Sequence, residues 1–344
     1  MLRCDAVFEG GGVKGIGLVG AVKALEEAGY VFENLAGTSA GSIISALLAV
    51  GYSAAEIETE LANVDYRKFR QEDCLDKFGP PGKFVGLVSS FGIYNADYFE
   101  SWLQDLLERK SKTTFGQIIR PGFTAQKYKY KFQAIASDVT SNKMLVLPGA
   151  LADFGLDPDG FSIARAVRMS MSIPFYFEPC KLTDKAGMQH LLVDGGMLSN
   201  YPIWLLDRKT PNPPWPTFGI KFDDDQKNSE TADSKNPVPD AKTRDSQGSL
   251  IRYVASLVTT MINAHDQFHI SESKGDYART ILIPTSVRTA AGNVKVSTTD
   301  FDITREMSDG LLNNGYVAAK SFLRTWSFEA WKAKYRRGRG PGAG

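Results

Sequence analysis

Two glycine-rich turns near the N-terminus each follow an apolar run and precede a helical pattern. The first run, Leu2–Glu9, ends in glycines and is typical of a buried strand. A helical spacing over Val13–Ala28 follows, and Gly29 ends it. A second strand over Phe32–Ala36 leads through a short turn into an almost wholly apolar helix over Ser42–Val50. Strand, turn and helix repeated at this spacing predict βαβ units and a mainly parallel central sheet.

Further elements follow along the chain. The pattern predicts helices over Asp97–Leu107, Ser162–Met171 and Leu250–Ile262, and strands over Lys129–Ala136, Met144–Leu147, His190–Val193 and Arg279–Pro284. Because we expect the last helix and strand to complete the same core, the sequence predicts one domain over residues 1–330.

Three segments depart from this regularity. Residues 77–94 are rich in Gly, Pro and Phe, and they form either a loop packed on the core or a mobile apolar lid. Residues 223–249 contain almost no large apolar side chain and predict a mobile polar insertion. Residues 331–344 are basic and glycine-rich; we expect a disordered terminus, with an anchor to anionic lipid as the alternative.

Composition excludes several classes of protein. Of 344 residues, 43% are hydrophobic and 23% charged, as in ordinary soluble globular chains, and the net charge of +1 gives no bulk attraction to nucleic acid. Cys4, Cys74 and Cys180 lie far apart, so we expect no disulfide framework and no zinc site, but a reducing compartment. Without a signal segment or an apolar run of ~18 residues, a cytoplasmic location is expected. Peripheral membrane contact and oligomeric state stay open.

The turn between the second strand and its helix reads Gly37-Thr38-Ser39-Ala40-Gly41. This GxSxG pattern in a strand–turn–helix context is typical of a nucleophile elbow, which exposes a serine oxygen at a strand end. The flanking Gly37 and Gly41 let neighbouring backbone pass without Cβ clashes. The helix N-terminus beside Ser39 favours developing negative charge. We therefore predict Ser39 as a nucleophile.

The first glycine turn offers backbone amides for an oxyanion. Glycines let N–H donors approach a carbonyl oxygen closely, as acyl transfer requires. The spacing of Gly10, Gly12 and Gly15 also fits the G-x-G-x-x-G of dinucleotide sites, and Glu33 lies near the place of their acidic residue, so that alternative is weakened but open. The phosphate-loop pattern fails because no GK[ST] follows. Lys14 is either a solvated lysine or a cation for a lipid phosphate.

Asp194-Gly195-Gly196 follows a predicted strand, and an aspartate there is by itself often a turn former. A Ser-His-Asp triad needs a histidine in reach, and the chain has only three. His190 lies some 13 Å from Asp194 along the strand at ~3.3 Å per residue. His265 and His269 share one face of a predicted helix and remain an alternative third member. A Ser39–Asp194 dyad without histidine is the better fit, and it requires a desolvated Asp194 with a raised pKa.

Taken together, three motifs resemble the patatin-like phospholipases: GGGVKG at 10–15, GTSAG at 37–41 and DGGMLSNYP at 194–202. Segments 92–107, 136–140 and 164–179 follow the pattern of this family in the same order, so the resemblance covers roughly residues 5 to 205. Two departures stand out. The family often has an arginine where Lys14 stands, and the polar insertion after Pro202 means that lid and acyl-pocket details do not transfer.

The resemblance implies a three-layer α/β/α fold, a Ser39–Asp194 dyad and hydrolysis of lipid acyl esters, such as phospholipids, without metal or cofactor. The implied oxyanion loop consists of Gly10, Gly11, Gly12, Val13, Lys14 and Gly15. Three other functions remain open: acyl transfer from the same acyl-serine to an acceptor other than water, a lipid-binding module without catalysis, and a nucleotide-dependent oxidoreductase.

Overall fold

A mixed sheet of eight strands forms the centre of the computed structural model in its described residues, in the order β11-β10-β1-β2-β5-β9-β8, with β6 also paired to β5. The structure describes residues 1–64, 71–72, 92–122, 126–223, 275–290, 292–298, 300 and 302–336. The sheet strands are β1 (Leu2–Phe8), β2 (Tyr30–Thr38), β5 (Phe132–Asp138), β6 (Lys143–Leu147), β8 (Cys180–Thr183), β9 (Gln189–Asp194), β10 (Thr217–Asp223) and β11 (Thr280–Pro284).

Strand direction changes at β5. From β11 through β10, β1 and β2 to β5 every pairing is parallel, as the repeated strand–turn–helix pattern predicts. Beyond β5, the strands β6, β9 and β8 pair antiparallel. Two small sheets join β3 (Gln71–Glu72), β4 (Gly92–Asn95) and β7 (Phe175–Phe177), and β12 (Ser286–Thr289) with β13 (Gly292–Lys295).

Helices cover both faces of the sheet, which gives the α/β/α layering. They are α1 (Ile16–Glu27), α2 (Ala40–Val50), α3 (Ala54–Ala62), α5 (Asp97–Arg109), α6 (Gln126–Lys129), α7 (Ile163–Ser170), α8 (Ile203–Leu206), α10 (Arg305–Thr325) and α11 (Phe328–Tyr335). Residues alternate along a strand, so Ala6 and Phe8 of β1 join the core under α1 and α2, whereas Val7 packs with Leu206 of α8.

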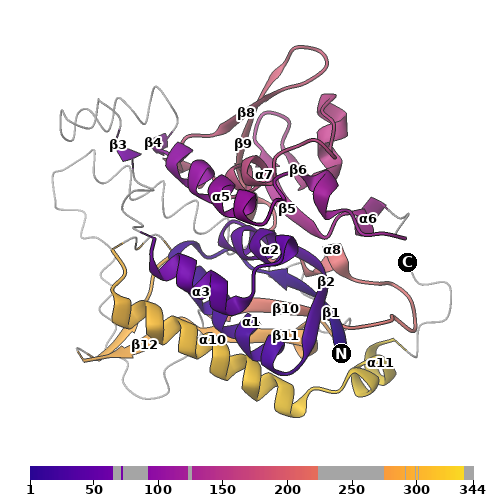
Figure 1. Ribbon diagram of the computed structural model, residues 1–344, viewed down its shortest axis with the longest axis vertical. Coiled ribbons are helices and arrows are strands. Elements are labelled where there is room, and N and C mark those ends of the chain that lie inside the picture. Colours follow the sequence, from indigo (N-terminus) through magenta and orange to yellow (C-terminus); the bar gives the residue numbers. More distant parts are fainter. Residues whose placement is uncertain are drawn as a thin grey trace.

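The long helix α10 lies alongside α1, although the two are far apart in the sequence (Figure 1). Their backbones approach closely because glycines face one another: a Cβ on Gly315 would stand 1.9 Å from the Gly17 carbonyl oxygen. A Cβ on Gly20 would come equally close to the Leu312 carbonyl oxygen, at 1.9 Å. These contacts fix the first turns of α1, which begins directly after the first glycine turn, against α10.

One edge of β5 brings two loop-forming strand ends together. Thr38, the last residue of β2, pairs with Ile135, and Asp194, the last residue of β9, pairs with the next residue, Ala136. The opposite edge of β5 is taken by β6 over the same residues. Because β2 and β9 end at adjacent positions on this edge of β5, Ser39 and Asp194 lie close together although they are 155 positions apart in the sequence.

The predicted strand over Lys129–Ala136 is displaced toward the C-terminus. Its N-terminal residues instead form α6 and a local pairing, in which the Arg120 amide donates to the Lys129 carbonyl at 2.8 Å and the Lys131 amide donates to the Ile118 carbonyl at 3.0 Å. The strand in the sheet therefore begins at Phe132. Lysine and tyrosine alternate over residues 127–131, which is typical of a strand, but these residues belong to α6 and to an isolated bridge between Tyr130 and Ile119.

The disordered terminus expected over 331–344 is wrong for residues up to 336. Residues 331–335 belong to α11, and Arg336 follows the helix directly. Ser327 caps the start of α11, because its hydroxyl accepts from the Ala330 amide at 3.3 Å. Trp331 is only 5% exposed, and Arg336 forms an ion pair with Asp207. A buried tryptophan and a paired arginine give this basic segment enough packing to order it.

Several predicted features lie outside the described residues: residues 77–91 of the loop or lid predicted over 77–94, the insertion from 224 to 249, the helix at 250–262 and the tail after 336. Cys4 and Cys180 are free, buried thiols, while Cys74 also falls outside the description. In the part of the chain that is described, no helix combines the length and the apolar character needed to cross a membrane.

Candidate active site

Ser39 occupies a sharp turn between β2 and α2, with φ 52° and ψ −126°. A non-glycine residue at positive φ costs of order 1–3 kcal/mol, so the surrounding contacts must hold it in place. They are tight on both sides: a Cβ on Gly37 would stand 2.2 Å from the Gly41 carbonyl oxygen, and one on Gly41 would stand 2.4 Å from the Phe8 carbonyl oxygen. The structure therefore has the elbow geometry expected of GxSxG, with both glycines required sterically.

The backbone of Ser39 is fixed by its neighbours. Its amide donates to the Ser170 hydroxyl at 3.1 Å, and its carbonyl accepts from the Ser42 hydroxyl at 2.6 Å. The residue before it, Thr38, donates its hydroxyl to the Ser199 carbonyl at 2.9 Å. With its main chain held in this way, Ser39 presents its hydroxyl at the N-terminus of the 11-residue helix α2.

Asp194 is 2% exposed and sits at the end of β9 beside Ser39. Its Oδ1 accepts from the Gly196 amide at 2.7 Å, whereas its Oδ2 is buried without a hydrogen-bond partner among the described residues. Burial raises the pKa of Asp194 to about 6, against smaller lowering effects of the Gly196 amide and the Ser39 hydroxyl. The Ser39 hydroxyl is thus close enough to act on the carboxylate, although it does not reach hydrogen-bond geometry, as is common in apo sites.

Three amides of the loop Gly10–Gly15 are already engaged. The Gly10 amide donates to the Asn200 carbonyl at 3.0 Å, and the Val13 amide donates to the Thr298 carbonyl at 3.1 Å. The Lys14 amide closes a turn within the loop at 3.2 Å. These three groups hold the shape of the loop and are not free to bind a ligand oxygen.

The amides of Gly11 and Gly12 are different, because no hydrogen bond from either is found within the described chain. Gly12 has φ +54°, and a Cβ there would stand 2.0 Å from the Thr298 carbonyl oxygen. A Cβ on Gly11 would stand 2.3 Å from the Phe222 ring, and one on Gly15 would stand 3.1 Å from the Ala40 Cβ. The loop therefore packs closely against the elbow, Phe222 and Thr298. Within the described chain, its two adjacent amides at Gly11 and Gly12 make no hydrogen bond.

Lys14 is not the solvated lysine that the sequence suggested. It is 4% exposed, and its ammonium lies 4.9 Å from the centre of the Phe222 ring. A cation over an aromatic face is stabilised by the ring quadrupole, which makes burial of this long side chain acceptable. Sequence alone does not reveal this contact because Phe222 is 208 residues away.

The ring nitrogens of His190 contact carboxylates other than Asp194. Its Nδ1 lies 2.7 Å from Asp138 Oδ2 and its Nε2 lies 3.4 Å from Asp184 Oδ2. The side-chain hydrogen bond with Asp138 raises the pKa of His190. Its place on β9, four residues before Asp194, agrees with the expectation that it is not a triad member. His265 and His269 lie outside the described residues.

The structure adds contacts to the site that sequence reasoning missed. Ser170 binds the Ser39 amide, Asn200 contacts the glycine loop, and Thr298 closes it from the C-terminal region. Asn200 lies in the DGGMLSNYP segment, so that motif carried a signal for it. For Ser170 and Thr298 no local pattern predicts the contact.

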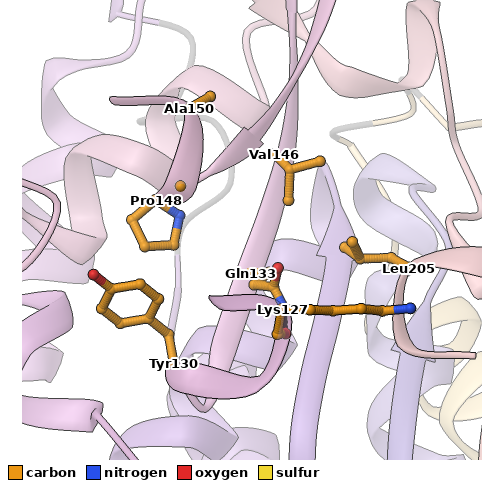
Figure 2. A pocket seen from close by; sticks show the side chains of 8 residues that line it. Lys127, Tyr130, Gln133, Val146, Pro148, Ala150 and Leu205 are labelled. Carbon is orange, nitrogen blue, oxygen red and sulfur yellow. Dashed lines mark hydrogen bonds between the residues drawn. The ribbon is translucent and has the colours of Figure 1, made fainter. Parts of the chain in front are cut away.

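A cavity of ≈ 270 Å³ lies apart from these residues (Figure 2). Its lining includes Lys127, Gln133, Val146 and Leu205, and none of the predicted site residues belongs to it. Gln133 is near the start of β5, whereas the residue paired with Asp194 is nearer its end. This cavity therefore does not contain the reacting groups of the candidate site.

The model of the family described as patatin-like phospholipase matches residues 6–207, more than half of the chain. The chain belongs to the patatin-like phospholipase family. An uncharacterized protein of Bacillus subtilis, YqhO, is 37% identical over 94% of this chain and 99% of its own length. The human patatin-like phospholipase domain-containing protein 6 is 30% identical over 57% of this chain but only 12% of its own. The crystal structure of VipD from Legionella pneumophila matches with TM-score 0.52 and 18% identity, over 94% of this chain and 67% of that one.

The patatin-like match contains every residue predicted for the site, from Gly10 to Asp194, and it also contains Asn200. It ends before β10 begins. Phe222 and Thr298, which pack against the glycine loop, therefore come from outside the matched part of the chain. The patatin-like fold in this protein is completed around the loop by its C-terminal third.

Proposed function

We propose that this protein is a lipid acyl hydrolase of the phospholipase A or lysophospholipase type, acting through a Ser39 acyl-enzyme with Asp194 as general base. The observation that carries the proposal is the buried Asp194 Oδ2, which has no hydrogen-bond partner in the described part of the chain while the strained Ser39 stands beside it. An unsatisfied buried carboxylate oxygen is costly, and such a cost is typically retained at functional sites.

The raised pKa of Asp194 supports its role as a base. An aspartate at its ordinary pKa near ~3.9 accepts protons weakly. Burial raises the pKa of Asp194 to about 6. The carboxylate is therefore still mostly ionised at pH 7, but it is a stronger base than an ordinary aspartate. The two groups that lower the pKa, the Gly196 amide and the Ser39 hydroxyl, are neutral, so no fixed cation weakens the base.

In the proposed cycle, Asp194 takes the Ser39 hydroxyl proton while the serine oxygen bonds to the ester carbonyl carbon. The tetrahedral intermediate collapses, the ester C–O bond breaks, and Asp194 returns the proton to the leaving alcohol. A water molecule then gives a proton to Asp194 and attacks the acyl-serine. The fatty acid leaves as Ser39 recovers its proton.

The oxyanion hole in this proposal is the Gly10–Gly15 loop, and within it the amides of Gly11 and Gly12. They are the adjacent donors left without a partner within the described chain, whereas the amides of Gly10, Val13 and Lys14 hold the loop together. One well-placed donor to the developing oxyanion stabilises the transition state by about 3–4 kcal/mol. The N-terminus of α2 adds a favourable field for the same negative charge.

Removing the nucleophile tests the proposal. Purified wild-type protein and Ser39→Ala are incubated with phosphatidylcholine and lysophosphatidylcholine vesicles, and free fatty acid is measured by mass spectrometry. We expect release by the wild type and a loss of at least ~10³-fold in Ser39→Ala, because no other group forms the acyl-enzyme. A fluorophosphonate probe should label the wild type at Ser39 only.

Two outcomes would contradict this function. Fatty acid release that survives Ser39→Ala would place the chemistry elsewhere, and a folded wild type without labelling or release would indicate a lipid-binding module. Adding glycerol or a thiol separates hydrolysis from acyl transfer, because a transferase forms the acylated acceptor in competition with free fatty acid.

A further inference from the structure

Asn200 joins the glycine loop to the rest of the site through two hydrogen bonds. Its carbonyl accepts from the Gly10 amide at 3.0 Å, and its side-chain Nδ2 donates to the Gly10 carbonyl at 3.2 Å. The side chain is part of a residue that is 8% exposed, so water offers little competition for these bonds. The first residue of the loop is thereby fixed by one asparagine.

The side-chain oxygen of Asn200 lies between the loop and the Asp194 turn. A Cβ on Gly10 would stand 2.2 Å from this Oδ1, and a Cβ on Gly196 would stand 2.9 Å from it. The same Cβ on Gly196 would stand 3.0 Å from Asp194 Oδ1. Because Asn200 Oδ1 and Asp194 Oδ1 are both about 3 Å from this Cβ, the two oxygens lie within about 6 Å of each other. At that distance a charge on one group alters the pKa of the other.

The preceding residue extends the connection to the nucleophile. The Ser199 carbonyl accepts from the Thr38 hydroxyl at 2.9 Å, immediately before Ser39. The Gly10 position is also close to the nucleophile, since a Cβ there would stand 3.1 Å from the Ser39 Cβ. One short segment, Ser199–Asn200, therefore contacts the elbow, the glycine loop and the aspartate turn.

We infer that Asn200 is a positioning residue that aligns the glycine loop with Ser39 and Asp194. The inference rests on the proposed function and adds to it the group that sets the direction of the Gly11 and Gly12 amides. Asn200 fixes the loop at Gly10, and the Thr298 carbonyl fixes it at Val13, on either side of the two unpaired donors. A shift of the loop by about 1 Å would move both donors off the oxyanion, and such displacements can cost ~10²-fold in rate.

Asn200→Ala removes the side-chain bond and leaves the backbone pair with Gly10 in place. We expect kcat for ester hydrolysis to fall roughly 10- to 100-fold with KM within about 3-fold, because oxyanion contacts are made chiefly in the transition state. Asn34→Ala is the matched control: Asn34 is also buried and its Nδ2 approaches two carbonyls, but it lies in the middle of β2, five residues before Ser39. We expect that control to lower thermal stability and to leave kcat within about 2-fold.

Asn200→Asp tests in solution the closeness of Asn200 to Asp194 on which the inference depends. It keeps the size of the side chain but places a negative charge within about 6 Å of Asp194 Oδ1, which should raise the pKa of Asp194. The acid limb of the kcat/KM profile should therefore move to higher pH in Asn200→Asp and stay in place in Asn200→Ala. Gly10→Ala, whose methyl group would collide with Asn200 Oδ1, should lose less activity when combined with Asn200→Ala than the two single losses predict together.

The outcomes separate this inference from the proposed function. If Ser39-dependent hydrolysis is present but Asn200→Ala is destabilised with unchanged kcat, Asn200 is structural only and the inference is wrong. An unmoved acid limb in Asn200→Asp would equally contradict it. If the wild type shows neither turnover nor fluorophosphonate labelling of Ser39, the proposed function fails, and the role of Asn200 fails with it.

Discussion

Asp138 and Asp194 lie at the ends of two neighbouring antiparallel strands, β5 and β9, and both are buried, at 1% and 2% exposure. Their surroundings differ. Asp138 accepts from the Ser141 hydroxyl at 2.5 Å, from His190 at 2.7 Å and from the Thr140 amide at 2.9 Å. Asp194 has one amide donor on Oδ1 and none on Oδ2 in the described part of the protein.

Desolvation and hydrogen-bond donors act in opposite directions on the pKa of each carboxyl group. Burial raises the pKa of Asp138, but the donors around it outweigh that effect and leave the pKa below its ordinary value. At Asp194 desolvation is stronger and the donors are fewer, so burial raises the pKa to about 6. Two side chains with similar exposed fractions are therefore a structural acceptor in one strand and a candidate base in the next.

A raised pKa alone does not identify the base. Asp5, which is fully buried, also has its pKa raised to about 6 by burial. Its Oδ2 lies 3.2 Å from the Arg208 guanidinium, and its Oδ1 accepts from the Asn34 amide at 3.0 Å. Asp5 lies in the middle of β1 and not at the strand end beside Ser39, and it has both oxygens occupied. Among the described residues, only Asp194 combines the raised pKa with an unpaired oxygen next to a strained serine.

The largest expected effect comes from replacing each strand-end aspartate by asparagine. Asp194→Asn removes the base, and we expect kcat/KM for ester hydrolysis to fall by about 10³–10⁴-fold, the scale of comparable triad losses. Asp138→Asn should keep kcat/KM within about 3-fold, since Asp138 contacts His190 and Ser141 and not Ser39. Initial rates at pH 8, with folding checked by circular dichroism, measure both. Near-wild-type activity in Asp194→Asn would end its assignment as the base.

An intermediate effect concerns pH. The active form of Asp194 is the carboxylate, and its pKa is about 6, so activity should be present above pH 6 and be lost as the pH falls through that value. We expect kcat/KM to drop about 10-fold between pH 7 and pH 5, with a slope of one in the acid limb. The pH profile of kcat/KM, measured in stopped assays with an ester substrate that does not ionise in this range, tests the prediction. An acid limb near pH 4 would show that Asp194 is not the desolvated group described here.

The sequence predicts the two local parts of this site well, because each depends on residues within a few positions. Gly37, Ser39 and Gly41 create the elbow through the strand–turn–helix context, and Asp194 ends a strand before two glycines. Even the need for a desolvated base follows from the chemistry of a serine–aspartate pair, before any coordinate is known. Local turns and strand ends can therefore be predicted from the sequence.

The arrangement of these parts depends on pairings between distant residues, which no local pattern contains. The edge of β5 shared by β2 and β9, the burial of Lys14 under Phe222 and the Thr298 bond to Val13 all belong to this class. A lysine or a basic terminus suggests solvent exposure because most such residues are exposed. Packing partners far along the chain overturn that expectation for Lys14 and for α11.

The smallest expected effect separates the two aspartates by the pH dependence of stability. The pKa of His190 is raised by Asp138, so the stability from this pair is full below the ordinary histidine pKa of ~6.5 and is lost as the pH rises through the higher folded value. The pKa of Asp138 is lowered, so its contribution is present above ~3.9 and is lost only in stronger acid. Asp138→Asn should lower the free energy of unfolding by about 1–3 kcal/mol through lost hydrogen bonds.

The difference between wild type and Asp138→Asn should be largest near pH 5–6 and shrink toward pH 8, as measured by urea unfolding at each pH. His190→Asn should reproduce this trend and keep kcat within about 2-fold, because His190 contacts Asp138 and Asp184 and not Asp194. Stability from the Asp138 pair and activity from Asp194 would then change in opposite directions between pH 5 and pH 8. A large loss of kcat in His190→Asn would contradict this separation, because it would show that His190 contributes to catalysis and that the dyad assignment is incomplete.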